Sequence, residues 1–142
     1  MLPLKSNQVW LNGSFDVLHT GHIKLFRIAR MLAGSQGHVW VGTDTDDRIS
    51  SHKGYSRPIN SLQDRMLMLS SIKYIDHVLP FASNTELESH ISTIMPDFMV
   101  IGDDYRGKPI IGSQFIKEIY YVSRDGKSTT NIVDGFKDLY EW

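Results

Sequence analysis

The residues best suited to chemistry lie in one short stretch, residues 12–22, which read NGSFDVLHTGH. His19 and His22 are three residues apart, so a helix would place both imidazoles on one face of its first turn. Gly13 and Gly21 have no Cβ and allow a ligand to approach the backbone closely. The stretch therefore predicts a site where two imidazoles face the same bound anion.

The segments on either side place this stretch at a strand-to-helix turn. Residues 9–11, Val-Trp-Leu, are apolar and predict a strand, and the apolar residues within 23–32 have the spacing of a helix. The first N–H groups of a helix have no partner inside the helix, and the helix dipole is positive at that end. The turn is therefore expected to attract a phosphate group.

Two other interpretations of the histidines stay open. Each could be an ordinary packed or solvated side chain, and a pair at i and i+3 could share a zinc ion. The sequence has no cysteine and no other cluster of histidines to supply further zinc ligands, which disfavours a zinc site. The lack of cysteine also excludes a disulfide framework and a thiolate nucleophile, and it leaves the redox compartment open.

Length and charge narrow the class of protein. A chain of 142 residues with 41% hydrophobic residues suits a single domain, predicted to span residues 1–142. The formal net charge of −1, from 15 basic and 16 acidic residues, predicts no general attraction to nucleic acid or to an anionic membrane. We find no signal-peptide pattern and no apolar run near the ~20 residues of a membrane span, so a cytoplasmic protein is expected.

The rest of the chain alternates between predicted strands and helices. Strands are predicted at residues 38–42, 77–81, 98–101 and 118–122, and helices after Ser61, after Asn84 and over residues 131–142. The run at 98–101 is the best candidate for a central strand. This alternation predicts a three-layer, Rossmann-like α/β domain with about five mostly parallel strands.

Residues 43–60 lack an apolar pattern and are predicted to form a long loop. Such a loop in a compact domain often carries function, although a solvated surface excursion fits the composition as well. Asp103 and Asp104 follow the strand at 98–101, at the edge where open α/β sheets bind their ligands. Residues 124–130 again combine basic, glycine and hydroxyl residues before a predicted helix, which fits phosphate binding, plain capping or both.

These motifs resemble two signatures of the cytidylyltransferase family, within the nucleotidyltransferase superfamily. The first, GxFDxxHxGH, is matched at every fixed position by Gly13, Phe15, Asp16, His19, Gly21 and His22. The second, RTEGxSTT, is matched in part by Arg124, Gly126, Ser128, Thr129 and Thr130. The two motifs stand in the family's order, which argues against coincidence.

The likeness extends over nearly the whole chain and points to two groups within the superfamily. Residues 102–105, GDDY, resemble the GDDW/Y element of bacterial glycerol-3-phosphate cytidylyltransferases, the closest overall likeness. Residues 53–60, with Asp64 and Arg65, instead resemble the adenylyltransferase domain of ADP-heptose synthesis. The resemblance implies a nucleotidyltransferase fold. It also implies transfer of a nucleotidyl group from a nucleoside triphosphate to a phosphorylated polyol, glycerol 3-phosphate first, or to a phosphorylated sugar, with release of pyrophosphate.

The same resemblance implies roles for individual residues. The catalytic set is His19 and His22 on the triphosphate, Lys53 on the phosphate of the attacking substrate, and Arg124 on the β- and γ-phosphates. The nucleotide-binding set is Gly13, Ser14, Phe15, Asp16, Gly21, Asp103, Asp104, Ser128 and Thr129, and the substrate-binding set is Lys53, Arg57 and Arg65. Asp16 is expected to orient the motif. A divalent ion, Mg²⁺, is expected to accompany the triphosphate without a dedicated protein cage.

The nucleotide expected from the sequence is CTP. The exocyclic amino group of cytosine is a donor that the carboxylate of Asp103 can accept, whereas the adenylyltransferase relatives tend to have glycine there. Residues 53–60 point to ATP, but they are expected to meet the phosphorylated co-substrate and not the base.

Three expectations concern the protein as a whole. A homodimer is expected, because the family is commonly dimeric and because Trp10, Trp40 and Trp142 are large apolar residues that a small domain leaves partly exposed. A catalytically silent nucleotide-binding protein on the same fold is the alternative from another class, since a fold does not fix a function. A zinc-binding structural module is the third.

Overall fold

The computed structural model describes residue 2 and residues 4–123 of the chain. Within these residues the elements are β1 (Gln8–Gly13), α1 (Thr20–Ala33), β2 (His38–Asp44), α2 (Asp46–Lys53), α3 (Leu62–Ser70), β3 (His77–Phe81), α4 (Asn84–Ile94), β4 (Phe98–Gly102), η1 (Asp103–Tyr105), η2 (Ser113–Phe115) and β5 (Glu118–Val122). Arg124, Ser128, Thr129 and the helix predicted over residues 131–142 lie outside the described residues.

The strands form one sheet in the order β3-β2-β1-β4-β5, and every neighbouring pair is parallel. The prediction of about five mostly parallel strands is confirmed. The run at residues 98–101 is the interior strand β4, but the middle position belongs to β1, which pairs with both β2 and β4. The chain extends the sheet one way from β1 to β3 and then the other way through β4 and β5. The strand order therefore switches between β1 and β4.

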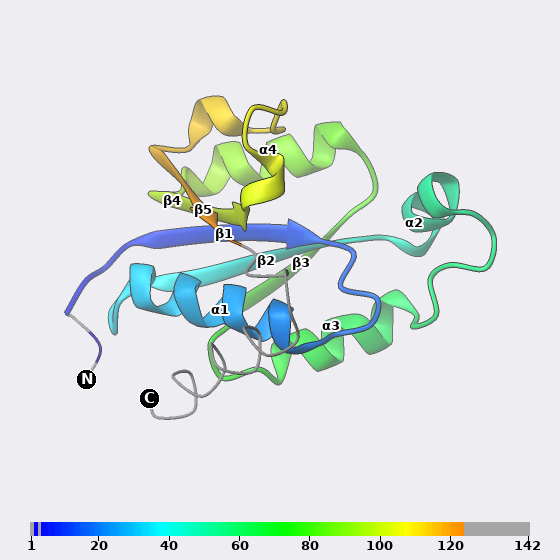
Figure 1. Ribbon diagram of the computed structural model, residues 1–142, viewed down its shortest axis with the longest axis horizontal. Coiled ribbons are helices and arrows are strands. Elements are labelled where there is room, and N and C mark those ends of the chain that lie inside the picture. Colours follow the sequence, from blue (N-terminus) through cyan, green and yellow to red (C-terminus); the bar gives the residue numbers. More distant parts are fainter. Residues whose placement is uncertain (1, 3, 124–142) are drawn as a thin grey trace.

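Helices cover both faces of the sheet, so the predicted three layers are present. Helices α1 and α3 lie on one face and α4 lies on the other (Figure 1). The core on the α1 and α3 side includes Phe26, Ala29 and Leu69, and the core on the α4 side is built around Trp10 and Ile91. No helix in the described part of the chain is long and apolar enough to cross a membrane.

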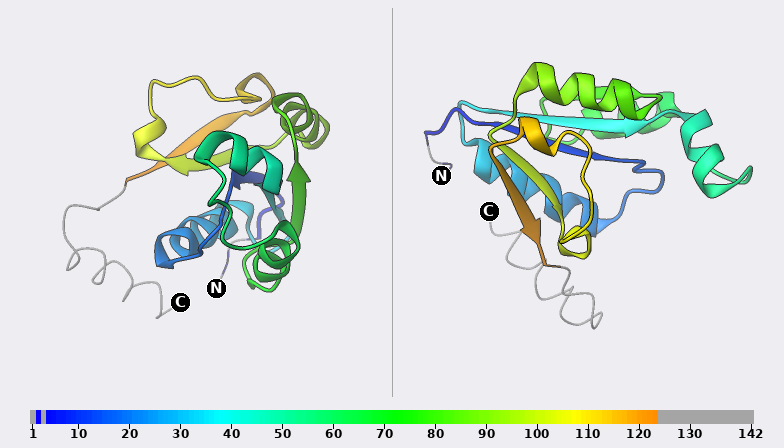
Figure 2. Two further views of the ribbon diagram at one scale, coloured as in Figure 1. Left: turned by 90° about the vertical axis from the view of Figure 1, so that its right-hand side faces the viewer. Right: turned by 90° about the horizontal axis from the view of Figure 1, so that it is seen from above.

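The prediction of a loop over residues 43–60 is wrong for its first half, because Thr43 and Asp44 end β2 and α2 follows. The Thr45 side chain accepts a hydrogen bond from Arg48 N at the start of α2, and Gly54 ends the helix with a φ of 96°. Ile49 is the only buried residue among the eight of this helix, so it shows no apolar stripe. Helix α2 lies beyond the carboxyl ends of the strands (Figure 1), and the left view of Figure 2 looks at the molecule from that side.

The expected incomplete burial of the tryptophans is wrong for Trp10, whose exposed fraction is 0%. Trp40 is partly exposed, and Trp142 lies outside the described residues. Trp10 thus gives no support to the predicted homodimer, which stays a prediction.

Candidate active site

A cavity of about 430 Å³ opens at the carboxyl ends of β1, β2 and β4. Its wall combines the end of β1, the β1–α1 turn, the start of α1, helix α2 and the end of β4; its residues include Asn12, Gly13, Ser14, Phe15, His22, Asp44, Arg48, His52, Lys53, Gly102 and Tyr105. This is the point where the strand order switches, which is where open α/β sheets bind their ligands. A cavity of this size suits a small molecule.

The two signature histidines stand side by side at the amino end of α1. His19 caps the helix and His22 is its third residue, and the centroids of the two rings are 3.9 Å apart. Nδ1 of His19 accepts a hydrogen bond from Gly21 N at 3.0 Å, and Nδ1 of His22 accepts one from His19 N at 3.2 Å. Because both Nδ1 atoms are acceptors, a neutral imidazole at either position carries its proton on Nε2 and presents that N–H as the donor.

Gly21 is needed for the conformation of His19. A Cβ at position 21 would lie 2.7 Å from Cε1 and 2.9 Å from Nδ1 of the His19 ring. The His19 ring can therefore fold back over the helix start only when residue 21 has no side chain. Thus the glycine between the histidines acts by making room for an imidazole and not by adopting an unusual φ.

Phe15 packs against His22 from the core side of the turn. Its backbone has a φ of 47°, in the left-handed region that residues other than glycine rarely adopt. Phe15 is almost fully buried, and its ring lies edge-on to the imidazole of His22, with the ring centroids 5.4 Å apart. The centroids of the Phe15 and Phe26 rings are 5.3 Å apart. This strained residue anchors the turn in the core and supports one wall of the cavity.

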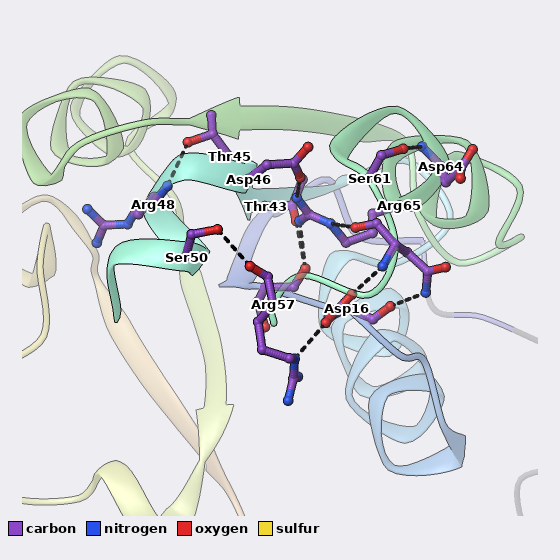
Figure 3. A network of polar contacts seen from close by, with 12 residues as sticks. Asp16, Thr43, Thr45, Asp46, Arg48, Ser50, Arg57, Ser61, Asp64 and Arg65 are labelled. Carbon is purple, nitrogen blue, oxygen red and sulfur yellow. Dashed lines mark hydrogen bonds and ion pairs between the residues drawn. The ribbon is translucent and has the colours of Figure 1, made fainter. Parts of the chain in front are cut away.

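Asp16 ties the signature turn to the segment between α2 and α3 (Figure 3). Its carboxylate, 2% exposed, accepts hydrogen bonds from Ile59 N at 2.9 Å, Asn60 N at 2.8 Å and Arg57 Nε at 2.9 Å. Burial raises the pKa of the Asp16 carboxyl, but the bonds from Asn60, Ile59 and Arg57 outweigh burial and hold the pKa below its ordinary value. The carboxylate is therefore charged and fully engaged, which fits the expected orienting role.

Arg65 was predicted to bind substrate, but its side chain has an exposed fraction of 0%. Its guanidinium donates to Asn60 O, Ser14 O, Thr43 Oγ1 and Asp46 Oδ1 at 2.8–3.0 Å. The guanidinium therefore bonds only to groups of the protein and has no surface that a substrate could reach. The prediction that Arg65 contacts a substrate directly is wrong.

Unlike Arg65, the other two residues predicted to bind substrate, Lys53 and Arg57, are not fully buried. The Nζ of Lys53 donates to Ser14 Oγ at 3.0 Å, so this cation reaches from α2 across to the signature turn and lines the cavity. Arg57 uses Nε to bond Asp16, and its side chain is 38% exposed.

Two further cavity residues, Arg48 and His52, were missed by sequence reasoning. They lie one turn apart on α2, and His52 Nδ1 is 2.7 Å from Arg48 O. Arg48 donates to Asp44 Oδ1 and Asn84 Oδ1, both at 2.7 Å. Both residues could have been found by recognising α2 from its Thr45 cap and its charged residues. Arg48 and His52 are then at positions i and i+4, which share a helix face. Together with Lys53 they bring two cationic groups and an imidazole to this side of the cavity, where Asp44 pairs with Arg48.

Asp103 and Asp104 begin η1, directly after β4, as the position of the motif predicted. The Asp103 carboxylate accepts a hydrogen bond from Arg106 Nε at 2.8 Å, and both side chains are exposed. The cavity wall contains the flanking Gly102 and Tyr105 and neither aspartate. Asp103 is thus paired with a neighbour on its own turn.

The described residues hold no group of three or more His, Asp or Glu side chains that could bind a metal ion.

The fold has a cavity at the switch point, with His22 of the histidine pair on one side and Arg48, His52 and Lys53 of α2 on the other. These features define a Rossmann-like α/β domain of the nucleotidyltransferase type. The chain belongs to the cytidylyltransferase-like family, whose model matches residues 10–133. The family predicted from the signatures is confirmed.

Curated relatives are bifunctional HldE proteins. The chain is 39% identical over 130 residues to HldE of Campylobacter fetus subsp. fetus, 41% over 135 residues to that of Campylobacter concisus, and 42% over 135 residues to that of Sulfurimonas denitrificans. These matches cover 91%, 94% and 93% of this chain. The chain spans only 28%, 28% and 27% of the lengths of those relatives.

Two solved structures share the fold. The lipopolysaccharide core biosynthesis protein from Thermoplasma volcanium matches with a TM-score of 0.66 and 22% identity, over 84% of this chain and 98% of that one. A protein with unknown function from Archaeoglobus fulgidus matches with a TM-score of 0.63 and 16% identity, over 86% of this chain and 92% of that one.

Proposed function

We propose that this domain is an adenylyltransferase that transfers AMP from ATP to the phosphate of a sugar 1-phosphate and releases pyrophosphate. The observation that carries the transfer is the cavity itself, where His22 of the signature turn and Lys53 of α2 line one space of about 430 Å³. Two anionic groups, a triphosphate and a phosphomonoester, can be held there from opposite sides. Membership of the cytidylyltransferase-like family supports nucleotidyl transfer in general, whichever nucleotide and co-substrate are used.

The choice of AMP and a sugar 1-phosphate rests on the relatives and on the local sequence. The HldE proteins, whose adenylyltransferase domain serves ADP-heptose synthesis, match more than 90% of the chain in the three cases above. Residues 53–60 resemble the same domain. The pairing of Asp103 with Arg106 weakens the argument that Asp103 reads cytosine.

The chemistry is one in-line displacement. An oxygen of the sugar phosphate forms a bond to the α-phosphorus of ATP, the bond from that phosphorus to the bridging oxygen breaks, and pyrophosphate leaves with the electron pair. The imidazoles of His19 and His22 donate from Nε2 to triphosphate oxygens as negative charge builds up, and the positive end of the α1 dipole assists. Lys53 and Arg48 neutralise and position the attacking phosphate.

Mg²⁺ bound to the triphosphate supplies further charge neutralisation when it is present. Asp16 takes no proton in this scheme, because its carboxylate is already engaged by three donors. Its part is to keep the signature turn and Arg57 in a fixed relation.

The test is pyrophosphate release from a matrix of substrates. ATP, CTP, GTP and UTP are each combined with heptose and hexose 1-phosphates and with glycerol 3-phosphate, and His22→Ala serves as the control for the site. We expect release with ATP and a sugar 1-phosphate, and a loss of about 10²–10³-fold in turnover for His22→Ala. No release in any combination would contradict the proposal.

CMP transfer from CTP to glycerol 3-phosphate is the second candidate. It is favoured by residues 102–105, which resemble the GDDW/Y element of that group. Release with CTP and glycerol 3-phosphate alone would establish it in place of adenylyl transfer.

A further inference from the structure

Arg65 is the point where four separate segments of the site meet. Its four bonding partners belong to the signature turn (Ser14), the end of β2 (Thr43), the first turn of α2 (Asp46) and the segment before α3 (Asn60). The Thr43 hydroxyl, itself fully buried, also donates to Ser14 O at 3.0 Å. A buried guanidinium is costly to desolvate, and here each of its three nitrogens donates at least one hydrogen bond.

Two of these segments carry groups of the proposed reaction, and the segment before α3 braces them. The signature turn leads into the paired histidines, and its Ser14 hydroxyl accepts from Lys53 Nζ. Helix α2 begins at Asp46 and carries Arg48 and Lys53 into the cavity. Asn60 and Ile59 donate to Asp16, next to Arg57. The contacts of Arg65 therefore set how the signature turn lies relative to α2, and Figure 3 shows Arg65 within this network of polar contacts.

We propose that Arg65 is a positioning residue that fixes the signature turn, residues 13–16, against the basic segment 46–60. This inference rests on the proposed function and adds a residue to it that cannot touch a substrate, since its side chain has no exposed surface. Arginine suits the role because one rigid planar group donates in several directions at once. A lysine offers a single ammonium on a flexible stem and cannot reach acceptors that lie around a plane.

The matched control for Arg65 is Arg30, which plays a comparable part at the opposite end of the sheet. Arg30 is 11% exposed and donates to Asp76 Oδ2, Gly34 O and Gly37 O at 2.7–2.8 Å. None of these residues lines the cavity. Arg30→Lys removes a similar set of bonds from the fold without touching the two segments that Arg65 joins.

The first measurement is steady-state kinetics of Arg65→Lys and Arg30→Lys with ATP and the sugar 1-phosphate that the wild-type protein uses. We expect Arg65→Lys to raise KM for the sugar 1-phosphate and to lower kcat, with a loss of about tenfold or more in kcat/KM. Arg30→Lys is expected to keep kcat/KM within about twofold. Equal effects of the two variants would mean that Arg65 acts on overall stability alone and would overturn the proposal.

The second measurement does not need activity. Amide hydrogen exchange at Ile59 and Asn60 reports the bonds to Asp16, and we expect it to speed up by about tenfold or more in Arg65→Lys and to stay unchanged in Arg30→Lys. Should Arg65→Lys fail to fold, Thr43→Val is the milder variant, because it removes one acceptor of Arg65 and one donor to Ser14 while keeping the side-chain shape.

Unchanged exchange at Ile59 and Asn60 in Arg65→Lys, or in Thr43→Val if only that variant folds, overturns the positioning role whatever the kinetics show. A wild-type protein without nucleotidyl transfer would contradict the proposed function, and the exchange measurement would then decide on Arg65 by itself.

Discussion

At the scale of single residues, the position of His19 depends on a missing side chain at position 21. We predict that Gly21→Ala lowers turnover about as much as His19→Ala, on the order of 10²–10³-fold, because the new Cβ would lie 2.7 Å from the His19 ring and displace it. The free energy of unfolding should change little, since the clash is with a movable ring and alanine favours a helix by about 0.5–1 kcal/mol over glycine.

The double variant separates this explanation from others. If Gly21→Ala acts only through His19, the variant with both changes should be no slower than His19→Ala alone, as measured by pyrophosphate release. A double variant that is slower by the product of the two single effects would show that Gly21 has a role of its own.

A second residue-scale prediction concerns Asp16 and pH. Its carboxyl has a pKa below the ordinary value in the folded protein, so its ionised form contributes stability above the unfolded-state pKa of about 3.9. That contribution is lost as pH falls toward the folded-state pKa. Asp16→Asn is therefore expected to be less stable than the wild type at pH 7, by about 1–3 kcal/mol, and the gap should narrow below about pH 4.

Urea unfolding between pH 7 and pH 3 measures this gap. Asp97→Asn is a useful comparison. Burial raises the pKa of the Asp97 carboxyl, but the hydrogen bonds from Gln8 N and Lys117 outweigh burial and hold the pKa below its ordinary value. Asp97 lies away from the cavity, so its variant should share the pH dependence and keep nucleotidyl transfer. A stability gap for Asp16→Asn that is constant with pH would contradict the charged, hydrogen-bonded carboxylate.

At the scale of elements, sequence patterns predict the strands and the long helices well. The apolar runs at 77–81 and 118–122 coincide with β3 and β5, and Ser61 caps α3 by accepting from Asp64 N, as the capping pattern predicts. These elements bury apolar surface against the sheet, so their apolar spacing records their structure.

Helix α2 escaped the same reasoning because apolar burial is not what holds it. It buries Ile49 alone, and it is held by the Thr45 cap, by acidic residues in its first turn and by the bond from Arg48 to Asp44. The resemblance to the adenylyltransferase domain assigned Arg65 to the substrate, whereas the structure buries its side chain. Its burial depends on acceptors up to 51 residues distant in the chain, which no local pattern reveals.

The position of α2 leads to a prediction about Lys53. Lys53→Ala should raise KM for the sugar 1-phosphate by about ten- to a hundredfold and change KM for ATP much less, because hydrogen bonds to a charged group contribute about 1.5–3 kcal/mol. The control is Lys117→Ala, a lysine that pairs with Asp97 beside the starts of β4 and β5. Initial-rate kinetics with each substrate varied in turn gives both constants. A larger rise in KM for ATP would place the triphosphate, and not the co-substrate, against α2.

At the scale of the whole molecule, the strand order decides where the ligand binds. The alternation of elements was enough to predict a parallel α/β sheet, and the signatures predicted a nucleotide site at the end of β1. The neighbours of each strand are set by packing between segments far apart in the chain, so the contribution of α2 to the same cavity required the structure. The residues that surround the cavity come from both halves of the sheet, on either side of the switch between β1 and β4.

A ligand that bridges these two halves should stabilise the whole fold, which gives the last prediction. A nucleotide present at a hundred times its dissociation constant adds about 2.7 kcal/mol to the free energy of unfolding, enough to raise Tm by several degrees for a domain of this size. We expect ATP with Mg²⁺ to raise Tm more than CTP with Mg²⁺ at equal concentration, since the adenylyltransferase proposal requires tighter binding of ATP. In His22→Ala the shift should shrink, because the variant loses one donor to the triphosphate. Differential scanning fluorimetry of the two proteins with each nucleotide measures these shifts, and Asp103→Ala separates the two candidates further. If CTP gives the larger shift and Asp103→Ala abolishes its advantage, Asp103 reads cytosine after all, and cytidylyl transfer replaces adenylyl transfer as the function of this domain.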